Sequence, residues 1–211
     1  MIVLGLTGSI GMGKSTAAAA LRRLGVPVHD ADGEVHRLLK SNPAVIAAIA
    51  AKFPGVLGDD GIDRVKLGRQ VFGDPAALGR LETILHPLVR QAERRFLRRA
   101  RASRATVAAL DIPLLFETGA ERRCDLVVVV SAPDFVQAAR VLRRAGMSRD
   151  RLAAIAARQT PDADKCRRAD YVAPTGLDRR TGLQALARVI TLLRHGGAIR
   201  GPRQHRRGHH A

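Results

Sequence analysis

The sequence is poor in the residues that cross-link small secreted proteins and in those that stack on nucleic-acid bases. Its 211 residues include two cysteines, Cys124 and Cys166, and these do not form a C-x-x-C pair. We therefore expect neither a disulfide framework nor a zinc site, and the composition fits a reducing cytoplasm. There is no tryptophan, and aromatic residues make up 3% of the chain, so few side chains could stack against bases.

Long hydrophobic runs are also missing. The longest purely aliphatic run, residues 126–130, is far shorter than the ~20 residues that a membrane-spanning helix needs. The N-terminal sequence MIVLGLTG has no basic region and no cleavage site, so we expect no secretory signal and no membrane association. Apolar residues nevertheless make up 46% of the chain, which is enough for a buried core and excludes a wholly disordered protein.

Acidic residues are few relative to basic ones. The chain has 36 Lys+Arg against 19 Asp+Glu, a formal net charge of +17, and only five of its basic residues are lysine. An arginine- and alanine-rich genome could account for this bias. A basic chain can bind nucleic acid, but it equally suits a protein whose substrates are polyanions. Because aromatic residues are sparse, we do not expect nucleic acid as a partner.

The order of the apolar runs predicts an α/β fold. Helical patterns alternate with short strand-like runs, and this alternation is typical of a parallel sheet covered on both faces. Residues 33–101 show helical patterns and no convincing strand, with breaks at residues 54–61 and at His86-Pro87. We therefore predict a five-stranded parallel sheet with an inserted helical subdomain. The five strands are expected at residues 2–6, 26–29, 105–110, 126–131 and 170–173.

The strongest chemical signal is a glycine-rich loop. The segment Gly8-Ser9-Ile10-Gly11-Met12-Gly13-Lys14-Ser15 fits G-x-x-x-x-G-K-[ST], follows a predicted strand and opens a predicted helix. Glycines let backbone N–H groups converge on phosphate oxygens, and the N-terminus of the helix adds its positive dipole. Lys14 can reach the β- and γ-phosphates, and Ser15 can ligate Mg²⁺. The loop predicts a nucleoside triphosphate and leaves the phosphoryl acceptor open.

Two carboxylates follow predicted strands of the same sheet. Asp32 comes after the second strand and Asp111 ends the third, and the carboxyl ends of parallel strands line one ligand-binding edge. Asp32 could accept a proton from an attacking hydroxyl or hold Mg²⁺ through water, and it could equally be the N-cap of the next helix. Asp111 could contact the shell of the Mg²⁺ ion or could be an ordinary strand-end carboxylate.

Arginine and histidine offer further candidates. Arg140 lies in a predicted helix, where a mobile guanidinium could offset charge on a transferred phosphoryl group. In so arginine-rich a chain, a solvated basic helix face is the competing interpretation. His86 could contact phosphate, or it could satisfy a backbone carbonyl where Pro87 interrupts the helix.

Taken together, these motifs resemble the dephospho-CoA kinase family. The resemblance runs from residue 2 to about residue 190, and its motifs are GLTGSIGMGKST at residues 5–16, Asp30-Ala-Asp32, DGIDR at residues 60–64, Leu81-Glu82, His86-Pro87, PLLFE at residues 113–117, Gln137, Arg140, Gln159 and Ala169-Asp170. Two places depart from the commonest pattern. Ser9 stands where glycine is frequent, and Pro174-Thr175-Gly176 stands where an Asn- or Asp-containing turn is usual.

The resemblance implies a reaction and a domain organisation. It implies transfer of the γ-phosphoryl group of ATP to the ribose 3′-hydroxyl of dephospho-CoA, giving CoA and ADP in the last step of coenzyme A biosynthesis. The implied fold is one P-loop kinase domain with a helical substrate-binding subdomain and a lid. The basic tail lies outside the resemblance, and its low apolar content predicts disorder. The domain spans residues 1–195, and its core lies at about 1–32, 102–112, 124–142 and 169–195. The helical subdomain lies at about 33–101, and the lid at about 113–123 and 143–168. The tail spans residues 196–211. The implied partners are ATP and dephospho-CoA, with Mg²⁺ as cofactor. We expect a cytoplasmic protein and favour a monomer, and the sequence leaves the oligomeric state open.

The resemblance also implies roles for single residues. Asp32 would be the general base, and Lys14 and Arg140 would stabilise the phosphates. Ser15 would ligate Mg²⁺, with Asp32 or Asp111 acting through water. The ATP phosphates would be bound by Gly11, Met12, Gly13, Lys14, Ser15 and Thr16, and dephospho-CoA by Thr7, His86, Arg90, Leu115 and Glu117. Two alternatives stay open: another small-molecule P-loop kinase, and a basic ATP-binding module that acts on RNA or DNA.

Overall fold

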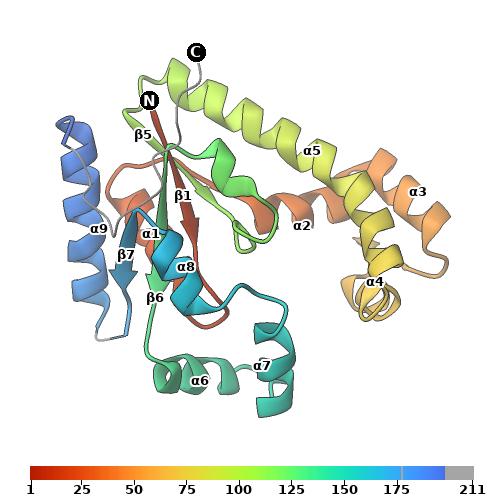
Figure 1. Ribbon diagram of the computed structural model, residues 1–211. Helices are drawn as coiled ribbons and strands as arrows, with labels where there is room; N and C mark the ends of the chain where they lie inside the picture. The colour runs from red at the N-terminus through yellow and green to blue at the C-terminus, as the bar shows by residue number, and fades with distance from the viewer. Residues whose placement is uncertain (177, 198–211) are drawn as a thin grey trace. The chain divides into compact units, whose positions relative to one another are not determined.

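The protein is described by a computed structural model that covers residues 1–176 and 178–197 (Figure 1). The chain separates into two compact units. The first comprises Met1–His29 and the chain from Ala100 onward, and the second comprises Asp30–Arg99. Most of the expected basic tail, from residue 198 to the end, lies outside the described residues.

The first unit is built on a five-stranded sheet. The strand order is β2-β5-β1-β6-β7, and the pairs of β1 with β5, β1 with β6 and β6 with β7 are parallel. The strands are β1 (Ile2–Thr7), β2 (Val28–Asp30), β5 (Val107–Asp111), β6 (Leu126–Ser131) and β7 (Tyr171–Pro174). The predicted five-stranded parallel architecture is therefore confirmed, with β1 at its centre.

Helices cover the sheet, which explains why its central strands are apolar along their whole length. On one face, α1 (Lys14–Arg23) and α9 (Arg179–Arg194) contact each other and share a core with Leu4, Leu6 and Val128. In Figure 1, α9 lies beside β7 and α8 (Asp162–Arg168) lies in front of β6. On the other face, the chain after β5 packs so closely on Gly5 that a Cβ there would lie 2.8 Å from the Cys124 Sγ.

Three further helical segments complete the first unit: η1 (Ala120–Arg123), α6 (Asp134–Leu142) and α7 (Arg149–Ala156). The hydroxyl of Ser148 accepts a hydrogen bond from the Arg151 N–H at 3.1 Å, which makes Ser148 the N-cap of α7. Helix α8 was not among the predicted helices. It has only seven residues, six of them charged or cysteine, so it shows no apolar periodicity that sequence analysis could detect.

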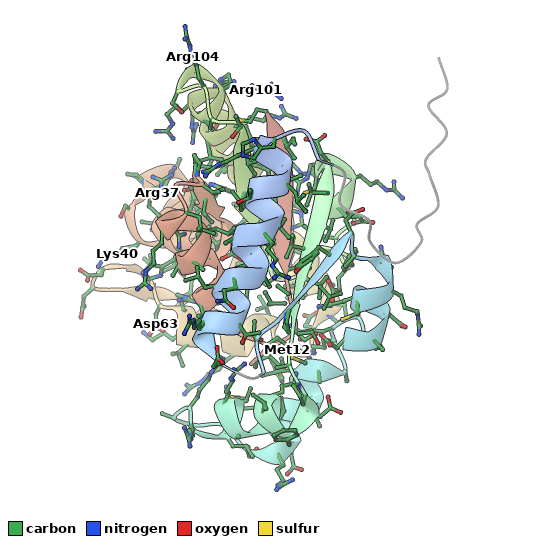
Figure 2. All side chains as sticks on the ribbon, turned by 90° about the vertical axis from the view of Figure 1, so that its left-hand side faces the viewer. Met12, Arg37, Lys40, Asp63, Arg101 and Arg104 are labelled. Atoms are coloured by element: carbon green, nitrogen blue, oxygen red, sulfur yellow. The ribbon has the colours of Figure 1, made fainter. Side chains whose placement is uncertain are left out.

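The second unit is mainly helical, with its own apolar core around Leu38, Ile49 and Phe53. Asp63, labelled in Figure 2, caps one helix by accepting a hydrogen bond from the Val65 N–H at 2.8 Å. Lys40, also labelled there, forms an exposed ion pair with Asp60 at 3.2 Å. The elements are α2 (Ala31–Ser41), α3 (Pro43–Lys52), β3 (Leu57–Gly58), β4 (Gly61–Ile62), α4 (Arg64–Val71) and α5 (Pro75–Ala102).

Two expectations for this unit were wrong. A small antiparallel hairpin, β3 with β4, occurs where no strand was expected. Its strands have two residues each, which is too short for an alternating pattern to register. Helix α5 also runs through Pro87 instead of breaking at His86-Pro87. Buried Leu81, Leu85 and Ala92 continue one apolar stripe across the proline, so packing on both sides outweighs the single backbone hydrogen bond that proline removes.

Much of the arginine content lies on the surface. Arg101 and Arg104 are exposed, and Figure 2 shows Arg104 projecting away from the ribbon. Within the described part of the chain, no helix combines the length and the apolar character needed to cross a membrane.

Candidate functional site

The glycine-rich loop connects the central strand β1 to helix α1. Helix α1 begins at Lys14, and its N-cap residue, Gly13, offers no side chain to cap it. The N–H groups of its first turn therefore have no side-chain cap, which is the arrangement that receives a phosphate at a helix N-terminus. Ser15 and Thr16, the next two residues of α1, are exposed.

Two glycines of this loop are required by its backbone. Gly11 and Gly13 have φ angles of +79° and +89°, in the left-handed region that other residues rarely adopt. A Cβ at Gly11 would also lie 2.6 Å from the Cγ2 of Val141, and a Cβ at Gly13 would lie 3.3 Å from Thr175. The loop is thus tightly covered by α6 and by the chain after β7, and neither position has room for a side chain.

The structure brings Lys14 and Asp111 together. The Lys14 Nζ donates a hydrogen bond to the Asp111 Oδ1 at 2.6 Å, and the two side chains are 17% and 6% exposed. The contact follows from strand pairing, because β5 runs beside β1 with Asp111 opposite Leu6. A lysine ammonium and a strand-end carboxylate therefore meet at the phosphate loop, at the sheet edge where the carboxyl ends of these parallel strands lie.

Arg140 lies beside the same loop. It projects from α6, and its guanidinium donates hydrogen bonds to the carbonyl of Gly11 at 3.4 Å and to the carbonyl of Thr175. Its side chain therefore belongs to the loop surroundings and not to a purely solvated helix face. Lys14 and Arg140 together give the loop two positive groups that phosphate oxygens could contact.

Thr175 is a residue of the site that sequence analysis did not assign. Its hydroxyl lies 2.6 Å from the carbonyl oxygen of Met12, a loop residue labelled in Figure 2, and 3.1 Å from that of Ser131. Because a hydroxyl carries one proton, it shares that proton between the two carbonyls. The only signal in the sequence was the departure of this turn from the Asn- or Asp-containing pattern.

Three of the predicted substrate-side residues lie in the first unit. The Thr7 hydroxyl is fully buried and donates to the Pro113 carbonyl at 3.0 Å, so it holds the chain that leaves β5. Leu115 is also fully buried, and one of its methyl carbons would lie 3.3 Å from a Cβ at Gly5. These contacts give both residues a packing role, and their contact with a substrate stays a prediction.

Glu117, the third of these residues, forms an ion pair with a buried lysine. Its Oε1 lies 3.0 Å from the Nζ of Lys165, whose side chain has no exposed surface, and it accepts a hydrogen bond from the Thr160 N–H at 2.7 Å. Burial raises the pKa of the Glu117 carboxyl. The N–H groups of Thr160 and Glu117 and the Lys165 ammonium together outweigh that effect, so the pKa lies below its usual value.

The second unit carries Asp32, His86 and Arg90, which are all exposed. The alternative role of Asp32 as a helix N-cap is wrong, because α2 already begins at Ala31. The cap is Asp30, whose Oδ1 accepts a hydrogen bond from the Gly33 N–H at 2.9 Å. Asp32 is instead a first-turn residue of α2. His86 lies one residue before Pro87 within α5 and does not mark a helix break.

The donor set at the loop fits a divalent cation that arrives with a nucleotide. Ser15 offers a hydroxyl oxygen and Asp111 a carboxylate oxygen, both of them hard ligands of the type that Mg²⁺ prefers. Within the described ranges, 1–176 and 178–197, no group of three or more His, Cys, Asp or Glu side chains could hold a metal ion on its own. Phosphate oxygens would therefore have to supply further ligands, as is usual for this cation.

Comparisons with known proteins agree on one family. A family model described as dephospho-CoA kinase matches residues 2–176. The chain is 58% identical over 196 residues to the dephospho-CoA kinase of Rhodospirillum rubrum, covering 92% of this chain and 93% of that one. It is 66% identical over 165 residues to the dephospho-CoA kinase of Paramagnetospirillum magneticum, covering 78% of each. Among solved structures, TT1252 from Thermus thermophilus matches with a TM-score of 0.79 and 37% identity, over 90% of this chain and 96% of that one.

The Glu117 ion pair generates a prediction about stability and pH. We expect Glu117→Gln to lower the free energy of unfolding at pH 7 by about 1–3 kcal/mol, because it leaves the buried Lys165 ammonium without a counter-charge. Since the folded-state pKa of Glu117 lies below the ordinary value of 4.5, this contribution is complete above pH 4.5 and fades as the pH falls further. Urea unfolding of both proteins between pH 7 and pH 3.5 should therefore show the difference shrinking with acidity.

The matched control is Glu121→Gln. Glu121 pairs at 3.0 Å with Arg168, whose side chain is 45% exposed, so solvent screens that pair more strongly and its loss should cost less at pH 7. A Glu117→Gln difference that is constant from pH 7 to pH 3.5 would contradict the assignment.

Proposed function

The chain belongs to the dephospho-CoA kinase family, and from that premise we propose that it transfers the γ-phosphoryl group of ATP to the ribose 3′-hydroxyl of dephospho-CoA. The reaction yields CoA and ADP and is the last step of coenzyme A biosynthesis. The observation that carries the proposal is the convergence of Lys14, Asp111 and Arg140 on the glycine-rich loop.

The loop residues bind the donor. The uncapped first turn of α1 and the loop N–H groups receive the phosphates, and the ammonium of Lys14 turns from Asp111 toward their oxygens. Because phosphoryl transfer passes through a loose transition state, its catalysis depends mainly on position and charge. Lys14 and Arg140 supply that charge beside the loop.

A divalent cation, which we propose to be Mg²⁺, would be held by Ser15, with Asp111 or Asp32 acting through water. When bound, it neutralises part of the negative charge of the triphosphate. The exchange of Lys14 from Asp111 to a phosphate leaves the Asp111 carboxylate available to that cation or to its water ligands.

The acceptor side of the proposal involves the second unit. Asp32 is the general base that orients the 3′-hydroxyl of dephospho-CoA and takes its proton, and His86 and Arg90 are the proposed substrate contacts of this unit. In the first unit, the proposed substrate contacts are Thr7, Leu115 and Glu117. The support for Asp32 is its match to the Asp30-Ala-Asp32 motif, its exposure, and the assignment of the capping role to Asp30. We also propose that the enzyme acts in a reducing cytoplasm, which the low cysteine content, two residues in 211, supports.

The direct test is product formation. Purified protein, MgATP and dephospho-CoA should give CoA, detected by mass as the gain of one phosphoryl group, with ADP in equal amount. Parallel reactions with other alcohols and with nucleosides as acceptors define the specificity. ADP formed with another acceptor and not with dephospho-CoA would replace the proposal with a different small-molecule kinase.

Removal of the loop lysine should disable phosphoryl transfer. We expect Lys14→Ala to lower kcat about a hundredfold or more, the scale of losing a principal electrostatic donor. Steady-state kinetics with dephospho-CoA measure this, with Lys52→Ala as the control, because Lys52 is an exposed lysine in the last turn of α3. Equal rates for the wild type and Lys14→Ala would remove Lys14 from the mechanism.

The neighbouring carboxylates Asp30 and Asp32 offer a matched pair for testing the base. Asp32→Asn should slow the single-turnover rate of phosphoryl transfer while ATP still binds, because the amide cannot accept the hydroxyl proton. Asp30→Asn removes the same charge two residues away but keeps an oxygen that can cap α2, so its single-turnover rate should stay near that of the wild type. The reverse result, a slow Asp30→Asn and a normal Asp32→Asn, would transfer the role to Asp30.

A further inference from the structure

Ile10, a residue of the phosphate loop, is held on both sides by glutamine side chains from distant parts of the chain. The Gln137 Nε2 donates to the Ile10 carbonyl at 2.8 Å, and the Ile10 N–H donates to the Gln159 Oε1 at 3.0 Å. We propose that Gln137 and Gln159 are positioning residues that together form a clamp on Ile10 and thereby set the shape of the loop that binds ATP. The inference rests on the proposed function only for the identity of the phosphoryl acceptor. The clamp itself rests on the two hydrogen bonds to Ile10.

The two hydrogen bonds are complementary in direction. One amide acts as a donor and the other as an acceptor, and the backbone groups of Ile10 decide which is which, since an N–H must meet an oxygen and a carbonyl must meet an N–H. The orientation of each side-chain amide is therefore fixed by its partner. The clamp uses both hydrogen-bonding groups of a single residue and leaves neither to be satisfied by the nucleotide.

Gln137 is part of a face of α6 that lies on the loop. Gln137 and Arg140 are one helical turn apart, and Arg140 donates to the next loop carbonyl, that of Gly11, at 3.4 Å. The methyl group of Val141 closes the space beside Gly11, where a Cβ would come within 2.6 Å. Any shift of α6 would therefore move the backbone of the loop with it.

Gln159 lies just after α7, on a segment that is anchored a second time. The N–H of the next residue, Thr160, donates to Glu117 at 2.7 Å, and Glu117 pairs with the buried Lys165. Helices α6 and α7 also contact each other. The clamp thus connects the loop to both ends of the α6–α7 hairpin, which spans part of the predicted lid.

A loop held in its binding shape loses less freedom when the ligand arrives, so the clamp should contribute to ATP affinity. A neutral hydrogen bond of this kind corresponds to about a threefold to tenfold change in an equilibrium constant. Both hydrogen bonds restrain the backbone of Ile10. Breaking either one should therefore release most of the restraint on the loop that the other provides. Their effects should therefore combine to less than the product of the two.

The test uses Gln137→Met, Gln159→Met and the double variant, since methionine has a similar length and cannot form either bond. Calorimetric titration with MgATP, without acceptor, should give dissociation constants about threefold to tenfold above the wild type for each single variant. The increase in the dissociation constant of the double variant should be smaller than the product of the two single increases. In the coupled assay, KM for ATP should rise by a similar factor while KM for dephospho-CoA stays unchanged. Gln184→Met, an exposed position on α9, is the matched control.

Glutamate variants test the direction of each bond. Gln159→Glu keeps an oxygen to accept from the Ile10 N–H, whereas Gln137→Glu sets a carboxylate against the Ile10 carbonyl. Both variants add one negative charge beside the loop. Comparing them with each other therefore cancels most of the effect of that charge on ATP binding. We expect Gln137→Glu to weaken ATP binding more than Gln159→Glu, and the reverse order would overturn the assigned directions.

The outcomes separate the clamp from the proposed function. Methionine variants that bind ATP like the wild type, or that lose only thermal stability, overturn the clamp even if the wild type produces CoA. A wild type that yields no CoA, with ATP affinity still weakened in the variants, overturns the proposed acceptor and supports the clamp.

Discussion

The pairing of β1 with β5 is the constraint on which the whole site depends. Both strands are buried, parallel and adjacent, with Leu6 opposite Asp111, so their carboxyl ends open on the same edge of the sheet. The chain that leaves β1 becomes the phosphate loop and returns Lys14 to within 2.6 Å of Asp111. The side chains of Lys14 and Asp111 are 17% and 6% exposed, so each charge offsets part of the desolvation cost of the other. The ion pair therefore keeps an ammonium beside the loop in the absence of a nucleotide.

Around that ion pair, the loop is shaped by contacts to its main chain. Its carbonyl groups at Ile10, Gly11 and Met12 accept hydrogen bonds from three side chains: Gln137 and Arg140 of α6, and Thr175 after β7. Glycine makes this possible, since a Cβ at Gly11 would meet α6 at 2.6 Å. Such a loop presents its remaining N–H groups in a fixed arrangement. Fixed dipoles stabilise developing charge without having to reorganise during the reaction.

The sequence predicted those features that are encoded by neighbouring residues. The continuous apolar runs of β1 and β6 identified buried strands, and the loop motif identified Lys14, because each signal lies within about ten residues. The contacts of Thr175 and Gln159 with the loop span 163 and 149 residues, and no local pattern records them. The sequence left Asp32 open as a base or as the N-cap of α2, and the structure gives the cap to Asp30, because the two carboxylates are chemically equal and only the backbone decides between them.

The high positive net charge of the chain and the two positive groups at the phosphate loop, Lys14 and Arg140, have different effects. Arg101 and Arg104 are exposed, and interactions of such groups are screened beyond about 8 Å at physiological ionic strength. Lys14 and Arg140 are different, because each is held in a defined position by carboxylate or carbonyl oxygens next to the loop. Surface arginines can raise the local concentration of anionic substrates such as ATP and dephospho-CoA. In the proposed mechanism, recognition of the triphosphate depends on the positioned groups of Lys14 and Arg140 and on the backbone N–H groups of the loop. The net charge of +17 does not supply that arrangement.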